Sequence, residues 1–153
     1  MVGVAATIRP DSWSFPLLLH VLGAMLLVGA LILAASALIL AWRGGTGGLV
    51  RLGFRSVVLG ALPAWVLMRV GGEWIASKED LTDSDVAWIG MGYTTADLGL
   101  LLLLISILLA GLATRRAGRA QNPAGFGRVP AALVSLLVIA YLAVVWAMST
   151  KPV

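Results

Sequence analysis

Few ionisable side chains lie inside the apolar stretches of this 153-residue sequence, and they are the candidates for chemistry. His20 is the single histidine, and it stands in the apolar run that begins at Phe15. Arg69 is followed one helical turn later by Glu73, and Asp97 stands near the start of another apolar run. A charge placed in hydrocarbon is costly, so ionisable residues in such runs are candidates for a functional site.

The surroundings of His20 suit a haem ligand. If the run is helical, small residues such as Gly23 share the face of His20, so another group can approach the imidazole closely. Histidine is a common axial ligand of haem, and a nearby cation such as Arg69 can neutralise a propionate. The sixth ligand would come from Met68, from Met148 or from the His20 of a second copy of the chain.

Copper is the second cofactor that these residue types suit. Imidazole and thioether ligands favour Cu(I), and His20, Met68, Met91 and Met148 are expected at compatible depths in a membrane. The sequence has no cysteine, which excludes thiolate zinc sites and iron–sulfur clusters. The cofactor hypotheses are therefore haem b, copper or none.

Each candidate also has a purely structural interpretation. His20 can form a hydrogen bond across a bundle, and Arg69 can pair with Glu73 at i+4. Asp97 is suited to the first turn of a helix, where the helix dipole favours a carboxylate. The methionines can simply fill irregular space in a core.

The composition indicates whether these residues are surrounded by water or by lipid. Apolar residues make up 60% of the chain, charged residues 12%, and the mean hydropathy is +1.00. Seven acidic and eleven basic residues cannot cover a water-soluble domain of this size. Crossing about 30 Å of hydrocarbon takes about 20 apolar residues. Four runs approach that length, at 15–42, 54–75, 95–114 and 129–149.

We therefore predict an all-α membrane protein with one domain, a bundle of four transmembrane helices. Pro63 predicts a kink in the second span. An acidic loop, 76–94, joins the second span to the third. At 1.5 Å per residue, His20, Arg69 and Asp97 lie roughly 20 to 35 Å from the arginine-bearing loops at the other ends of their spans. Three helices are thus expected to bring ionisable groups to one layer.

The distribution of charge predicts the orientation. The two loops on one side contain seven arginines and no acid, whereas the other side carries four basic and seven acidic residues. Short arginine-rich loops stay in the cytoplasm, so we expect both termini and the acidic loop outside the cell membrane. The seven arginines are Arg43, Arg51, Arg55, Arg115, Arg116, Arg119 and Arg128.

A family resemblance enters through the run LHVLGAMLLVGA, residues 19–30. It resembles the first-helix pattern L-H-x-x-G-x-x-x-x-x-G of CopD-like and DUF2269-like integral membrane proteins. The resemblance implies a metal or haem role for His20, with Gly23 and Gly29 as packing positions. Leu27 stands where many members have tryptophan, and the further histidines of the family are absent here.

Two functions follow as hypotheses. The first is a small multi-pass membrane protein that binds haem b or copper through His20, near the outer face, for electron transfer or metal handling. The alternative is a non-catalytic accessory or assembly subunit that packs its small-residue faces against partner helices. The expected partners are the lipid bilayer and either further copies of the chain or other membrane subunits.

Other classes are less favoured. Topology alone explains the basic residues, so nucleic acid is not expected as a partner. No nucleophile elbow or oxyanion motif accompanies His20 and Asp97, so the sequence gives no positive indication of an enzyme. A transporter with His20, Arg69 and Asp97 as relay groups is disfavoured, because four spans with so few polar groups provide a poor pathway.

Overall fold

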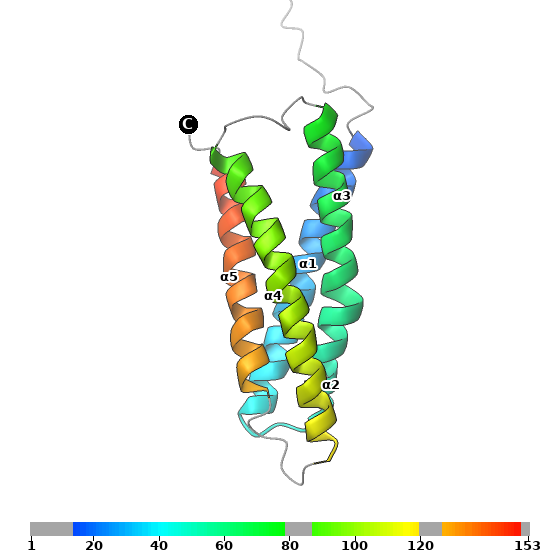
Figure 1. Cartoon of the computed structure of the whole chain (residues 1–153), viewed down its shortest axis with the longest axis vertical. Coiled ribbons are helices and arrows are strands. Elements are labelled where there is room, and N and C mark those ends of the chain that lie inside the picture. The colour runs from blue at the N-terminus through cyan, green and yellow to red at the C-terminus, as the bar shows by residue number, and fades with distance from the viewer. Residues whose placement is uncertain (1–13, 79–86, 120–126, 151–153) are drawn as a thin grey trace, which may run out of the picture.

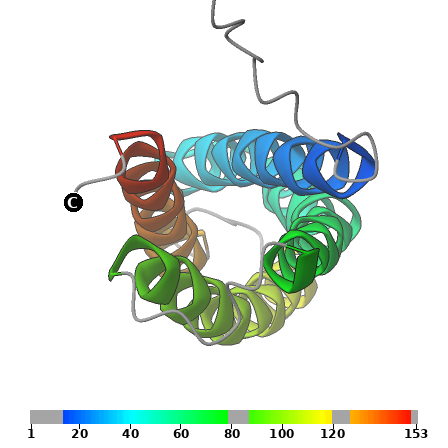
Figure 2. The same cartoon turned by 90° about the horizontal axis from the view of Figure 1, so that it is seen from above.

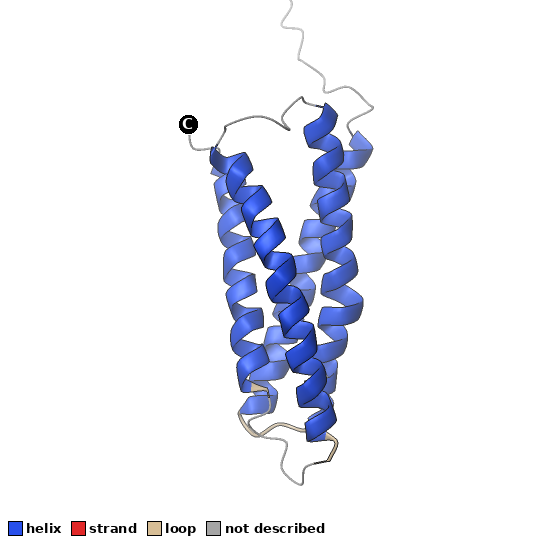
Figure 3. Cartoon of the chain, viewed as in Figure 1, coloured by secondary structure: helices blue, strands red, loops and turns tan. Residues whose placement is uncertain are grey.

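The computed structural model describes residues 14–78, 87–119 and 127–150. Within these residues every regular element is a helix, and no strand is present (Figures 1 and 3). The elements are α1 (Ser14–Trp42), α2 (Gly47–Arg55), a π-helix (Ser56–Ala61), α3 (Leu62–Lys78), α4 (Ala87–Ala117) and α5 (Arg128–Thr150).

Four helical stretches are long and apolar enough to cross a membrane, which confirms the predicted all-α, four-helix architecture. They are Ser14–Trp42, Gly47–Lys78, Ile89–Ala117 and Arg128–Thr150. Many of their large apolar side chains are exposed on the outside of the bundle, among them Met25, Leu59, Leu108 and Ile139. Lipid is the medium in which such a surface is stable, so the chain is a small multi-pass membrane protein.

Two helices begin earlier than predicted. The second starts at Gly47 rather than at residue 54, and α4 starts at Ala87 rather than at residue 95. The reason is that charged or polar residues limit the hydrocarbon span without ending a helix. Arg51 and Arg55 are exposed while Val50 is buried, so α2 is amphipathic. Residues 79–86 of the predicted acidic loop lie outside the described residues.

The second transmembrane stretch departs from α-helical geometry near the proline. It contains a π-helical turn, Ser56–Ala61, which ends just before Leu62 and Pro63. The N–H of Leu62 donates to the carbonyl five residues earlier. Proline has no N–H of its own, and a π-turn changes which carbonyl each nearby donor reaches. The turn is also tied to α1, because the hydroxyl of Ser56 donates to the carbonyl of Ala30 at 2.8 Å.

Seen from above, the helices form a ring in which α1 lies between α3 and α5, and α4 closes the circle (Figure 2). We call the end near Ser14 and Thr150 the terminal end, and the opposite end the arginine end. α4 packs against α2 at the arginine end, but α3 and α4 diverge towards the terminal end (Figure 1). α1 supplies fully buried core residues along its length, namely Leu27, Leu31 and Leu38.

Glycines bring α1 and α3 into close contact near the terminal end. A Cβ at Gly71 would lie 2.5 Å from the backbone nitrogen of His20, and one at Gly23 would collide with the backbone of Met68. Small residues at helix crossings in membranes permit this approach of backbone to backbone. The crossing places the His20 side chain directly on α3.

Candidate functional site

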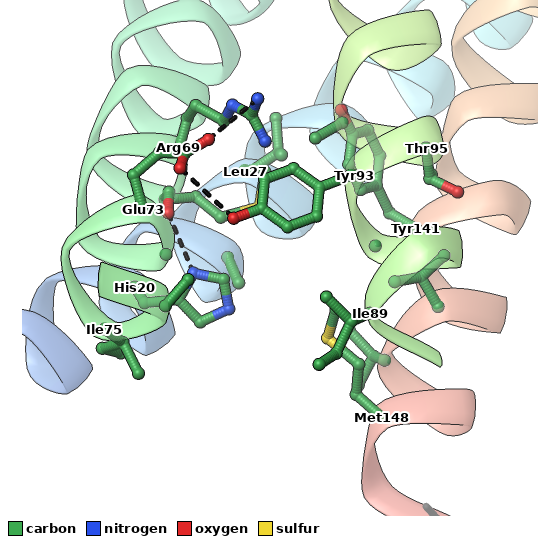
Figure 4. Close-up of a pocket in the computed structure, with 18 of the residues that line it drawn as sticks. His20, Leu27, Arg69, Glu73, Ile75, Ile89, Tyr93, Thr95, Tyr141 and Met148 are labelled. Atoms are coloured by element: carbon green, nitrogen blue, oxygen red, sulfur yellow. Dashed lines mark hydrogen bonds and ion pairs between the residues drawn. The ribbon is translucent and has the colours of Figure 1, made fainter. Parts of the chain in front are cut away.

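A pocket of about 360 Å³ opens near the terminal end, where α3 and α4 diverge. Its volume falls in the range of roughly 300–1,000 Å³ that is typical of ligand pockets. α1 and α3 form one wall, and α4 and α5 form the other (Figure 4). The lining is mostly apolar, and its principal polar or sulfur-bearing side chains are His20, Arg69, Glu73, Tyr93, Tyr141 and Met148.

His20 is oriented by α3. Its Nδ1 lies 2.8 Å from the backbone carbonyl oxygen of Met68. A carbonyl can only accept, so Nδ1 carries the hydrogen, and the lone pair of the neutral imidazole is on Nε2. Figure 4 shows this second nitrogen on the side of the ring that faces the space towards Met148. Histidines that ligate metals are commonly held by such a bond from the other ring nitrogen.

A glycine makes room for the ring. A Cβ at Gly72 would lie 3.0 Å from Nδ1 of His20 and 3.3 Å from Cε1, tighter than ordinary contacts. Together with Gly71, which faces the His20 backbone, it forms a seat for the imidazole on α3. The sequence Gly71-Gly72 therefore explains why the ring can lie against a helix rather than stand away from it.

Arg69 is the centre of a polar cluster that joins α3 to α4. Its Nη2 lies 2.9 Å from Glu73 and 3.3 Å from Asp97. Its guanidinium also lies 4.8 Å from the centre of the Tyr93 ring. The hydroxyl of Tyr93 donates to Glu73 at 3.2 Å. The four residues thus form a bridge across the diverging helices, with one positive and two negative charges.

The contacts of this cluster bear on the two interpretations of Arg69. The predicted pair with Glu73 is present, and Asp97 adds a second carboxylate from another helix. Because two carboxylates already neutralise the guanidinium, the geometry favours a structural role over that of a propionate counter-ion. Asp97 is not among the residues that line the pocket, and its ion pair with Arg69 connects it to the site.

The methionines separate into different places. Met68 is buried and lines the pocket, but its backbone carbonyl is the group that meets His20. Met148 lines the opposite wall and packs against Gly92 of α4. Met91 is half-exposed and does not line the pocket. The structure thus brings His20, Met68 and Met148 to one cavity.

Metal-binding side chains are sparse in the described part of the chain. It holds no group of three or more histidine, cysteine, aspartate or glutamate side chains that could bind an ion together. A bare metal ion in this pocket would depend on one imidazole, on thioethers and on the Glu73 carboxylate, which already pairs with Arg69. The pocket offers one well-oriented nitrogen and a large apolar space.

Two tyrosines of the pocket escaped the sequence analysis. Tyr93 is four residues before Asp97, so an earlier start of α4 would have predicted both on one face. Tyr141 is only 5% exposed, and its ring lines the pocket. Its hydroxyl faces Gly99 and is the one buried side-chain polar atom without a partner among the described residues.

Trp65 provides a further link between α3 and α4. Its Nε1 donates to the backbone carbonyl of Ala96 at 3.1 Å, next to Asp97 of the polar cluster. α3 and α4 are therefore also joined one helical turn from Arg69 in the direction of the arginine end.

Comparison of the chain with protein families, with curated proteins and with solved structures gives no match. The similarity to CopD-like and DUF2269-like membrane proteins rests on residues 19–30 alone and stays a prediction.

Proposed function

We propose that this chain is a small membrane haem protein in which Nε2 of His20 is an axial ligand of haem b. The observation that carries this proposal is the 2.8 Å hydrogen bond from Nδ1 to the carbonyl of Met68. This bond fixes the tautomer and the ring orientation that an axial ligand requires. It also directs the free lone pair away from the α3 backbone.

The apolar lining of the pocket favours haem over copper. A metal ion is held by side-chain atoms at about 2 Å and needs no large cavity. The cavity here measures about 360 Å³ and is lined mostly by apolar side chains. An apolar macrocycle gains free energy by leaving water for such a space, whereas a bare ion does not.

Other residues have defined parts in this proposal. Gly72 gives the imidazole its seat, and Met148 on the facing wall is the candidate for the sixth ligand. The cluster around Arg69 holds the spacing of α3 and α4, and hence the width of the pocket. When bound, the haem would supply one-electron oxidation and reduction.

The absorption spectrum of the protein purified from haem-replete cells tests the proposal. We expect a Soret band and one haem b per chain, both lost in His20→Gln. Glutamine retains an N–H that can donate to the Met68 carbonyl, but it does not provide an imidazole ligand. Thr95→Ala, which changes another pocket-lining polar residue, should keep the spectrum.

Three outcomes would overturn the haem assignment. The first is a wild-type protein that carries no haem when haem is abundant. The second is a His20→Gln variant with an unchanged Soret band. The third is stoichiometric copper without a Soret band, which would assign the pocket to the other candidate cofactor.

A further inference from the structure

A second cavity lies at the arginine end, far from His20 along the bundle. It is a groove of about 490 Å³ between the end of α2 and the last turns of α4. Its walls are almost entirely apolar, and Arg115 is the one charged residue among them. The lining consists of Phe54, Ile107, Leu108, Gly111, Leu112, Thr114 and Arg115.

The base of the groove is formed by a glycine against an aromatic ring. A Cβ at Gly111 would lie 3.3 Å from Cε2 of Phe54, so the absence of a side chain lets the ring lie close against α4. The hydroxyl of Thr114 donates to the carbonyl of Ala110 at 2.8 Å, so the helix already satisfies its donor. The groove thus offers an apolar path with a single cationic end.

The groove lies on the lipid side of the bundle. Leu108 and Leu112 at its edge are exposed on the apolar outer surface. From Ile107 to Arg115 the helix rises about 12 Å. An apolar chain that runs parallel to α4 can therefore lie in the groove with its polar end beside Arg115.

The arginines at this end have no acidic partner in the part of the chain that the structure describes. The sequence has no acidic residue between Asp11 and Glu73 and none after Asp97. Among the described residues the acids are Glu73 and Asp97, which lie near the terminal end, so neither provides a carboxylate beside Arg115 or beside Arg55 at the end of α2. Arginine forms strong, directional hydrogen bonds with phosphate, and anionic headgroups are the phosphates that a bilayer presents at this depth.

We propose that the groove between α2 and α4 binds one anionic phospholipid, with an acyl chain against Phe54 and Gly111 and the phosphate at Arg115. The apolar path and the adjoining uncompensated arginine match the two parts of that molecule. The site is independent of His20 and of any haem.

Neighbouring arginines provide the decisive comparison. Arg115 and Arg116 are adjacent and both exposed, but only Arg115 lines the groove. A diffuse attraction of anionic lipid to this end would weaken equally when either charge is removed. If the groove is a specific site, binding of the anionic lipid weakens much more when Arg115 is removed than when Arg116 is removed.

Native mass spectrometry of the intact chain from nanodiscs of mixed phosphatidylglycerol and phosphatidylcholine measures this. We expect one retained phosphatidylglycerol per chain in preference to phosphatidylcholine. Arg115→Gln should weaken retention about fivefold, the factor that corresponds to about 1 kcal/mol for one basic residue. Arg116→Gln should change it far less.

A second pair of variants tests the apolar part. Gly111→Leu adds a branched side chain to the wall of the groove against Phe54 and should reduce retention, whereas Gly90→Leu, on the same helix with open space around its Cβ position, should not. Equal losses in Arg115→Gln and Arg116→Gln, or equal retention of the two lipids by the wild type, would overturn the proposal. Unchanged retention in Gly111→Leu would overturn the seating of the acyl chain.

Discussion

Arg69 of α3 and Asp97 of α4 lie 3.3 Å apart and join two helices that diverge at this end of the bundle. Their side chains are 26% and 64% exposed, so the pair is partly screened and worth at most about 1 kcal/mol. Arg69 has further contacts with Glu73 and with the ring of Tyr93. Removing Arg69 should therefore cost more than removing Asp97.

Thermal unfolding in one mild detergent checks this order. Arg69→Gln is expected to unfold at a lower temperature than Asp97→Asn, and Asp97→Asn slightly below the wild type. The double variant should be no less stable than Arg69→Gln, because Asp97 loses its partner in either case. Equal midpoints for Arg69→Gln and the wild type would contradict the bridging role of the cluster.

Two glycines of α1 should respond in opposite ways to the same substitution. A Cβ at Gly23 would collide with the backbone of Met68, whereas nothing lies within 4 Å of a Cβ at Gly29. We expect Gly23→Ala to lower the free energy of unfolding by about 1–3 kcal/mol through overpacking. Gly29→Ala should raise it by about 0.5–1 kcal/mol, because alanine loses less conformational freedom in a helix.

Both variants can be measured by unfolding in sodium dodecyl sulfate titrations. If Gly23→Ala is as stable as Gly29→Ala, α1 and α3 do not approach as closely as described.

The unpaired hydroxyl of Tyr141 makes a further prediction. A buried donor without a partner costs about 1–3 kcal/mol, so Tyr141→Phe should be at least as stable as the wild type. Tyr93→Phe is the matched control, because it removes a hydroxyl that donates to Glu73. That variant should lose about 0.5–1.5 kcal/mol. A larger loss in Tyr141→Phe than in Tyr93→Phe would show that the buried hydroxyl has a partner after all.

The orientation in the membrane can be read from single cysteines. The sequence has none of its own, so each introduced thiol reports without background. Because arginine-rich turns stay in the cytoplasm, an impermeant maleimide added to intact cells should label Lys78→Cys and spare Arg116→Cys. Arg116→Cys should become reactive only after permeabilisation, and the reverse pattern would invert the topology.

The four membrane spans were predictable because the hydropathy of a segment indicates whether lipid or water surrounds it. Four apolar runs gave four helices. The ends of the helices were less predictable, since α2 and the first turns of α4 continue the helix through polar sequence. Backbone hydrogen bonding within a helix is as good beside headgroups as in hydrocarbon, so a change of polarity marks the membrane surface and not the helix end.

The depth of the candidate residues in the membrane was predictable, but the side of each helix that faces into the bundle was not. Helical rise alone placed His20, Arg69 and Asp97 in one layer, and the structure joins Arg69 to Asp97. Which sides of α4 and α5 face inward depends on how the helices pack, so the sequence could not show that Met148 lines the pocket and Met91 does not. The partner of His20 is a backbone carbonyl, which carries no signature in a sequence.

Because α3 and α4 diverge, the pocket lies between two helical hairpins. One hairpin consists of α1 and α3, and the other of α4 and α5. One hairpin holds the imidazole, and the other holds Met148. The hairpins are held together by the α1–α5 and α2–α4 contacts, and the Arg69 cluster spans the gap between α3 and α4. A thin, flat ligand can therefore occupy the pocket with less separation of the two hairpins than a thick one requires.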